Sequence, residues 1–264
     1  MLDIATIKKA YDSGLHVFER GLMREYLQYQ ILAILFTHPL GKKLSFLGGT
    51  CLRIVYGLPR FSEDIDFDNK NLSEAEFEEL GQFLQKELEK IGYLVEIHFV
   101  TKGAFHCYIK FPDLLYQYGI SPQKSEKILI QVDTFDQGTD YESDIFILDK
   151  FDFFSQIKVT PKAVILAQKL WTITQRPRLK GRDFFDIMFL FQNTQPDLTF
   201  LQAKFGKLEI SEIVGRILNE LNDTDYMKLA EDVRPFLLKS SDADKILLFP
   251  DFLKQSCASI SHQL

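Results

Sequence analysis

Residues 46–68 read FLGGTCLRIVYGLPRFSEDIDFD, and this stretch decides the fold. Two consecutive glycines follow a short apolar run, and an alternating acidic segment ends the stretch. Because successive side chains of a β-strand point to opposite faces, Asp64, Asp66 and Asp68 would share one face while the apolar residues between them point into a core. Like charges in a row are unfavourable unless a cation lies between them. The stretch therefore predicts a strand whose carboxylates bind a metal ion.

The order of these features is similar to the nucleotidyltransferase signature, which has a Gly-Gly or Gly-Ser turn, a spacer of about one helix and Asp-x-Asp on a strand. In detail, the stretch resembles the abortive-infection toxin family of nucleotidyltransferases (AbiEii/AbiGii-like). That family has a Gly-Gly-Thr turn, a Leu-Arg pair and an Arg-Phe-Ser-Glu-Asp-Ile/Leu-Asp-Phe run. These correspond here to residues 48–50, 52–53 and 60–67, and the resemblance recurs near residues 162–186.

The resemblance implies an α+β fold, in which a polymerase-beta-like mixed sheet is flanked by helices and followed by a C-terminal helical domain. We expect N-terminal helices over residues 1–40 to pack on the core, the nucleotidyltransferase core to cover 41–192, and the helical domain to cover 193–264. A chain of 264 residues is long enough for a catalytic domain and a helical one.

Hydrophobic periodicity and turn residues predict the elements along the chain. Helices are expected over 3–37, 50–57, from Ser73 to about 90, from Thr160-Pro161 to about 174, over 182–192 and as short segments within 197–264. Strands are expected over 60–68, 94–101, 105–111, 127–135, 145–148 and 153–157. Residues 111–125 read as a turn-rich loop. The strands predict one mainly antiparallel or mixed sheet.

Composition restricts the cellular setting and the kinds of site. No apolar run reaches the roughly 18 residues needed to span a bilayer, and the first residues lack a continuous apolar segment typical of a signal peptide. Three widely spaced cysteines favour reduced thiols and a cytoplasmic location, with no membrane partner. Five histidines without metal-ligand spacing argue against zinc. A net charge of −6 argues against broad, non-specific binding to nucleic acid.

The paired aspartates are the main candidates for catalysis. Nucleotidyl transfer requires neutralised triphosphate charge and in-line attack, and alternate strand positions let Asp64 and Asp66 reach the same divalent ions. Mg²⁺ (or Mn²⁺) suits such carboxylates together with phosphate oxygens. The alternative is an edge strand with solvated acids. The third carboxylate is Asp133 or, if the register places Gln131 there, is absent. Asp68 is expected to support the strand end.

The diglycine turn is the expected nucleotide-binding element. Gly48 and Gly49 allow the backbone to approach a phosphate, and the following helix would point its N–H groups at that anion. Thr50 caps this helix or donates its hydroxyl to phosphate. Arg53 contacts phosphate or instead pairs with Asp64 or Glu63. Arg60 is expected to be structural.

Residues 161–182 contain six basic residues and no acidic one, a local reversal of charge where an acceptor's phosphates could dock. The resemblance matches Lys169 to the family's helix lysine and residues 182–186 to its second motif. It implies that Lys169 holds phosphate, and that Asp183 orients Lys169 or acts as a general base. Otherwise Asp183 only complements a helix dipole. Asp186 would act with the motif or would only pair with Arg182 or Lys180, and Trp171 would stack a base or, more simply, pack in the core.

The resemblance implies transfer of a nucleoside monophosphate from an NTP to a hydroxyl acceptor such as tRNA, with a cognate antitoxin as partner. A second interpretation is a non-catalytic nucleotide- or protein-binding module on the same fold. A metal-dependent nuclease is a third, although it would not need a triphosphate-binding turn. No base-reading motif indicates which NTP is used.

Overall fold

The computed structural model describes residues 2–261, and these form two compact units. The first unit runs to Val55 and resumes over Phe61–Thr160, whereas the second comprises Tyr56–Arg60 and the described residues from Pro161 onward. The expected boundary after residue 192 therefore differs from the division by contacts, which falls after Thr160. The reason is that the first long helix after Thr160 packs on the helices that follow it.

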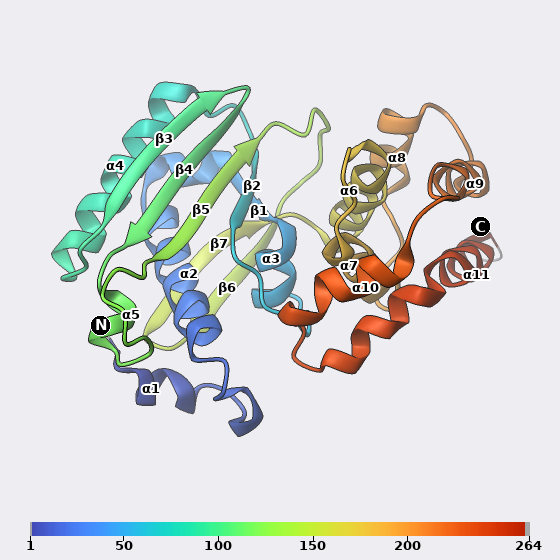
Figure 1. Cartoon of the computed structure of the whole chain (residues 1–264). Helices are drawn as coiled ribbons and strands as arrows, with labels where there is room; N and C mark the ends of the chain where they lie inside the picture. Colours follow the sequence, from blue (N-terminus) through green and yellow to red (C-terminus); the bar gives the residue numbers. More distant parts are fainter. Residues whose placement is uncertain (1, 262–264) are drawn as a thin grey trace. The chain divides into compact units, whose positions relative to one another are not determined.

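The first unit is built on a seven-stranded mixed sheet of order β3-β4-β5-β2-β1-β7-β6 (Figure 1). The strands are β1 Leu44–Leu47, β2 Ile65–Asn69, β3 Glu96–Lys102, β4 Ala104–Phe111, β5 Ile128–Phe135, β6 Asp144–Lys150 and β7 Phe153–Val159. Two neighbouring pairs, β2 with β5 and β1 with β7, are parallel, and the other pairs are antiparallel. The predicted α+β mixed sheet is thereby confirmed.

Helices of the first unit are α1 Ile4–Lys9, α2 Glu19–Thr37, α3 Gly48–Ile54, α4 Glu74–Lys90 and α5 Leu114–Gln117, with 3-10 turns at Ser13–Leu15 and Pro39–Lys43. The expected continuous helix over 3–37 is wrong, because the chain breaks at Asp12-Ser13-Gly14, residues that favour turns. The expected loop over 111–125 contains the short α5. The helix predicted from Ser73 is confirmed, including its capping box with Glu76.

Helices α2 and α4 supply the apolar cover of the sheet. In strand β5, apolar and polar residues alternate, so the two faces of the sheet differ in chemistry. Ile128, Ile130 and Val132 are buried, while Gln131 and Asp133 alternate with them and point to the other face. That second face carries polar and aromatic residues of β2, β5, β4 and β3. It is the face on which the candidate site lies.

The second unit is helical: α6 Lys162–Gln175, α7 Gly181–Phe191, α8 Leu198–Phe205, α9 Ile210–Glu220, α10 Tyr226–Val233 and α11 Phe249–Ser261, with 3-10 segments at Arg234–Phe236 and Ser240–Leu248. The predicted N-cap at Thr160 is wrong by one residue, since Pro161 is the N-cap of α6. Thr160 belongs to the sheet instead, where its N–H donates to the Phe46 carbonyl at 2.8 Å. Among residues 2–261, no helix is both long and apolar enough to cross a membrane.

Candidate active site

The carboxylate strand is shorter than the sequence predicts. Strand β2 begins at Ile65, so Asp64 lies immediately before it and only Asp66 and Asp68 lie within it. The expected start at Arg60 is wrong because residues 56–60 belong to the second unit, where Arg60 forms an isolated bridge with Leu237. Ile65 and Phe67 are buried as predicted.

Asp66 lies directly over the diglycine turn. Gly48 has a φ of +79°, and a Cβ added there would come within 2.1 Å of Asp66 Oδ2. No side chain fits in that space, and the positive φ favours glycine independently. Leu47, the last residue of β1, is the strand partner of Asp66. The register thus holds the turn and the carboxylate against each other, as the predicted nucleotide site requires.

Thr50 also links the turn to the acidic segment. Its hydroxyl donates to the main-chain carbonyl of Asp64, and its side chain is fully buried. Helix α3 has Leu47 as its N-cap and no side-chain capping bond, so the expected capping role for Thr50 is wrong. The residue instead determines where the chain carrying Asp64 runs relative to Gly48 and Gly49.

The strand register decides between the two candidates for the third carboxylate. Asp133 of β5 is paired directly with Asp66 of β2, and Asp133 therefore occupies the neighbouring position on the same face. Gln131 lies two residues earlier, and its Nε2 donates to both carboxylate oxygens of Asp133 at 2.9 and 3.0 Å. Gln131 therefore orients the acid and does not replace it.

His106 is a member of this group that the sequence interpretation missed. It is the strand partner of Asp133, and its Nδ1 lies 2.7 Å from Asp133 Oδ1. Both side chains are a little over one quarter exposed, at 28% and 27%. The alternation of β4, in which Cys107 and Ile109 are buried, could have placed His106 on the polar face, but its partner depends on the register of β4 with β5.

Asp68 has a supporting role. Its side chain is fully buried and accepts hydrogen bonds from the Gln137 N–H at 3.0 Å and the Tyr141 hydroxyl at 2.6 Å, while Lys70 Nζ lies 2.9 Å away. These partners satisfy a buried charge and fasten the loop after β5 to the end of β2. The alternative favoured from the sequence, a residue at the strand end, agrees with this geometry.

The donor set at the sheet fits a divalent ion shared with a phosphate. Asp66 and Asp133 occupy paired positions on the same face of neighbouring strands, and Mg²⁺ or Mn²⁺ prefers carboxylate ligands together with waters and phosphate oxygens. Within residues 2–261, no group of three or more His, Cys, Asp or Glu side chains has the geometry to hold a metal by itself. The protein side of the proposed metal site is accordingly two carboxylates, with Asp64 beside them in sequence.

Arg53 has a partner that the sequence did not indicate. Its Nε donates to Glu25 Oε2 at 2.8 Å, and its guanidinium lies 5.3 Å from the centre of the Phe61 ring. Glu25 is only 4% exposed and also accepts from Tyr11 at 3.0 Å and Lys150 at 3.2 Å. The contact with Glu25 ties the end of α3 to α2.

A second charged cluster lies within the helical unit. Lys169 of α6 is 2.7 Å from Asp183 Oδ1 and 2.9 Å from Asp186 Oδ2, both on α7. Arg60 donates through two nitrogens to the two oxygens of Asp186, each at 2.7 Å, and Arg176 Nε lies 3.0 Å from Asp183 Oδ2. The structure thus brings Lys169 together with the two aspartates of the second motif. Arg60 was expected to be structural, and its partner is Asp186.

Burial and charge compete in setting the pKa values of this cluster. Burial alone would lower the pKa of Lys169, but the carboxylates of Asp183 and Asp186 outweigh it and hold that pKa above its ordinary value. Burial likewise opposes ionisation of Asp183, yet the Lys169 and Arg176 charges bring its pKa below the usual value. Asp183 is therefore ionised and firmly paired, which makes it a poor proton acceptor.

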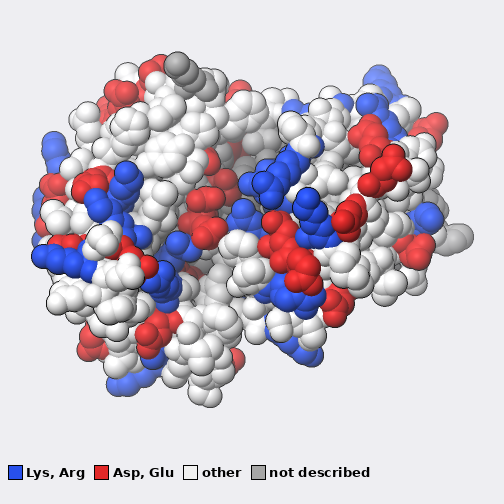
Figure 2. Space-filling view, viewed as in Figure 1, with Lys and Arg blue, Asp and Glu red and all other residues white. Residues whose placement is uncertain are grey.

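Other residues of the basic segment are used within the helical unit. The Arg182 guanidinium lies 4.8 Å from the Phe236 ring centre, and Trp171 packs edge-on against Phe205 with ring centres 4.9 Å apart. Trp171 therefore has the packing role. On the face shown in Figure 2, Lys and Arg side chains are interspersed with Asp and Glu, and they do not form one continuous basic patch.

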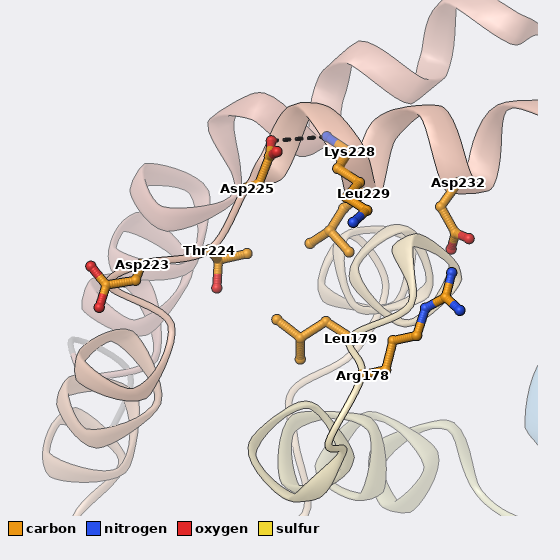
Figure 3. Close-up of a pocket in the computed structure, with 8 residues that line it drawn as sticks. All are labelled: Arg178, Leu179, Asp223, Thr224, Asp225, Lys228, Leu229 and Asp232. Carbon is orange, nitrogen blue, oxygen red and sulfur yellow. Dashed lines mark hydrogen bonds between the residues drawn. The ribbon is translucent and has the colours of Figure 1, made fainter.

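Arg178 lines a cavity of about 260 Å³ in the same unit. Figure 3 shows it near Asp232 of α10, whose carboxylate accepts the Gly181 N–H at 2.9 Å. The remaining lining residues are Leu179, Asp223, Thr224, Asp225, Lys228 and Leu229. The cavity carries both signs of charge and most of its charged side chains are exposed, so its chemistry selects no particular ligand.

Comparison with known proteins agrees with the fold. The crystal structure of JHP933 from Helicobacter pylori is similar with a TM-score of 0.60 and 19% identity, over 93% of this chain and 95% of that one. A further solved structure, "Crystal structure of putative nucleotidyltransferase from H. pylori", is similar with a TM-score of 0.61 and 18% identity, over 93% of this chain and 98% of that one. No curated protein matches the sequence.

The diglycine turn, the aspartate strand and the mixed sheet define a nucleotidyltransferase. The model of the family described as "Nucleotidyl transferase AbiEii toxin, Type IV TA system" matches residues 30–247. Since this match covers most of the chain, the protein belongs to that family of nucleotidyltransferase toxins.

Proposed function

We propose that this toxin transfers a nucleoside monophosphate from an NTP to a hydroxyl group of an RNA, such as tRNA, with Mg²⁺ or Mn²⁺ as cofactor and a cognate antitoxin as its partner. The cytoplasm, which supplies both substrates, is the proposed location. The observation that carries the proposal is the Asp66 carboxylate held over the Gly48 turn, with Asp133 at the paired position. A triphosphate lying against this turn would have carboxylates beside it for a shared cation.

The proposed roles follow from these positions. The backbone of Gly48 and Gly49 binds phosphate oxygens, because the absence of side chains permits close approach. Asp66 and Asp133 would hold the divalent ion together with phosphate oxygens, and Asp64 is proposed as a further ligand once the triphosphate is bound. The ion would supply charge neutralisation and would orient the attacking and leaving oxygens. Thr50 fixes the Asp64 main chain, and Arg53, ordered by Glu25, is proposed to contact a phosphate.

We assign Lys169 and Asp183 complementary roles. The Lys169 ammonium has three N–H donors, two of which can serve Asp183 and Asp186, and the third can bind a phosphate. The side chain is 13% exposed. Of the two roles expected for Asp183, orientation of Lys169 fits its lowered pKa, whereas acceptance of a proton does not.

The test is nucleotidyl transfer by the purified protein. Each of the four α-labelled NTPs is incubated with Mg²⁺ and total RNA. We expect at least one nucleotide to label RNA, and Asp66→Asn and Asp133→Asn to reduce the rate by about 100-fold or more. Asp149→Asn, which changes an exposed strand aspartate of β6, is the matched control and should retain activity. Failure of all four nucleotides to label any RNA would contradict the proposal and favour a non-catalytic module.

A further inference from the structure

The aspartate pair lies at one end of a ladder of rings on the sheet. His106 pairs with Asp133, and Tyr108, two residues further along β4, pairs with Gln131 on one side and His98 of β3 on the other. The strand register therefore places three rings on the same face as Asp133. Their centres are 6.4 Å apart from His106 to Tyr108 and 6.4 Å from Tyr108 to His98.

The rings are not part of the buried core. His98 is exposed, Tyr108 is half-buried and the His106 side chain is 28% exposed. The apolar neighbours in the same strands, Cys107 and Ile109, are buried on the opposite face. The ring plane of Tyr108 is tilted by 31° from that of His98 and by 35° from that of His106, so neither neighbour meets it edge-on. Such a row has the form of a stacking platform for unpaired bases.

The sheet order indicates which substrate this platform serves. Strand β1, which leads into Gly48, lies on one side of β2, and β5 with β4 and β3 lies on the other. If the β- and γ-phosphates of the triphosphate lie over the Gly48 turn, pyrophosphate would leave towards β1. In-line displacement then requires the attacking hydroxyl to approach from the β5 side. The ring ladder begins on that side.

We propose that the open sheet face formed by His98, His106 and Tyr108 binds the single-stranded end of the acceptor RNA and directs its terminal hydroxyl towards Asp133. Lys110 and Lys127 extend the same face, and Lys127 is paired with Glu96 at 2.9 Å. These two lysines would supply local phosphate contacts, while stacking of bases on the rings would supply most of the affinity. The acceptor role of the face rests on the proposed transfer to RNA, but binding of RNA can be measured without transfer.

Binding is measured by fluorescence anisotropy with a labelled single-stranded RNA of about 12 nucleotides, without NTP and with EDTA. Tyr108→Ala should weaken binding by about 5- to 100-fold, because it removes one stacking surface. Tyr108→Phe, which keeps the ring, should bind within about twofold of the wild type. Phe154→Ala is the matched control, since Phe154 is an aromatic residue of β7 that is 79% exposed.

Several results would overturn the assignment. They are wild-type affinity in Tyr108→Ala, equal weakening by Phe154→Ala, equally tight binding of an RNA duplex or tighter binding of single-stranded DNA. Thermal melting of each variant excludes unfolding as the cause. If the wild type transfers nucleotide but Tyr108→Ala keeps the same KM for RNA, the docking surface fails while the proposed function stands. If the wild type binds RNA through Tyr108 but labels none, the transfer proposal fails instead.

Discussion

At the scale of single residues, the site depends on Gly48, where no side chain can be accommodated. Gly48 combines a positive φ with a space filled by the Asp66 carboxylate, so two independent physical reasons demand glycine there. Asp68 shows the opposite situation. It has the same charge as Asp66 and lies two residues along the same strand, yet it is fully buried and bonded to Tyr141, Gln137 and Lys70. Identical residue types in one pattern thus have different roles.

We expect Gly48→Ala to reduce nucleotidyl transfer by about 100-fold, because the new methyl group would displace Asp66 by an ångström or more. Initial rates with labelled NTP measure this effect. The control is Gly119→Ala, since Gly119 also has a positive φ, of +67°, but has nothing within 4 Å of an added Cβ. If both variants lost activity equally, backbone strain would explain the loss and the contact with Asp66 would not.

At the scale of elements, pairs of neighbouring strands and helices determine the chemistry. Strand β5 places Asp133 beside Asp66, and β4 places His106 beside Asp133. Helices α6 and α7 similarly bring Lys169 to Asp183 and Asp186. Each of these groups combines residues more than ten positions apart in sequence, so local periodicity can place them on a face but cannot name their neighbours.

The pairing of α6 with α7 predicts how stability depends on pH. The pKa of Asp183 is below its ordinary 3.8, so its contribution to stability is complete above that value and is lost as pH falls through the lower folded pKa. The pKa of Lys169 is above 10.5, so its contribution is complete below 10.5 and is lost as pH rises through the folded pKa. The pair therefore stabilises the fold throughout the neutral range.

Urea unfolding from neutral pH to about pH 3 tests this dependence. The wild type should lose stability on acidification, and Lys169→Met should lose less over the same range, because Asp183 without its lysine titrates closer to its ordinary pKa. Asp149→Asn, a change of an exposed acid, should follow the wild-type curve. If the stability of Lys169→Met and of the wild type fell in parallel with pH, this ion pair would not be the cause of the loss of stability in acid.

At the scale of the whole molecule, the chain enters the second unit twice. Residues 56–60 contribute to it between α3 and β2, and the chain then returns to complete the sheet before continuing at Pro161. Arg60 is 2% exposed and binds Asp186, a residue 126 positions later, through a bidentate contact. Residues 56–60, in the middle of the segment that separates the diglycine turn from Asp64, are therefore a structural part of the helical unit.

Arg60→Leu should destabilise the protein by about 3–5 kcal/mol, because it leaves Asp186 buried with one cation fewer. Chemical unfolding measured by circular dichroism gives the free energy. Arg216→Leu removes a half-exposed arginine paired with Glu220 on α9 and should cost only about 0.3–0.5 kcal/mol. Similar losses in the two variants would argue against a special contribution of the buried Arg60 contact.

The sequence by itself determined the class of fold and the main candidate residues. The Gly48-Gly49 turn, the alternation around Asp66, the capping box at Ser73 and most strands are recorded in residue types and short spacings, which act through local backbone geometry. These signals need no knowledge of distant partners. They were sufficient to predict the strands of a mainly antiparallel or mixed sheet, whereas the nucleotidyltransferase assignment of the turn came from the family resemblance.

Only the tertiary structure decided which acid accompanies Asp66, which cation neutralises Asp186, and where the helical unit begins. Asp133 and Gln131 have the same parity in β5, so the choice between them required the register with β2. In sequence, Arg60 comes just before the acidic segment, yet its partner lies on α7. Such pairings depend on how distant segments pack together, because hydrogen bonding and burial act between neighbours in space whatever their separation along the chain.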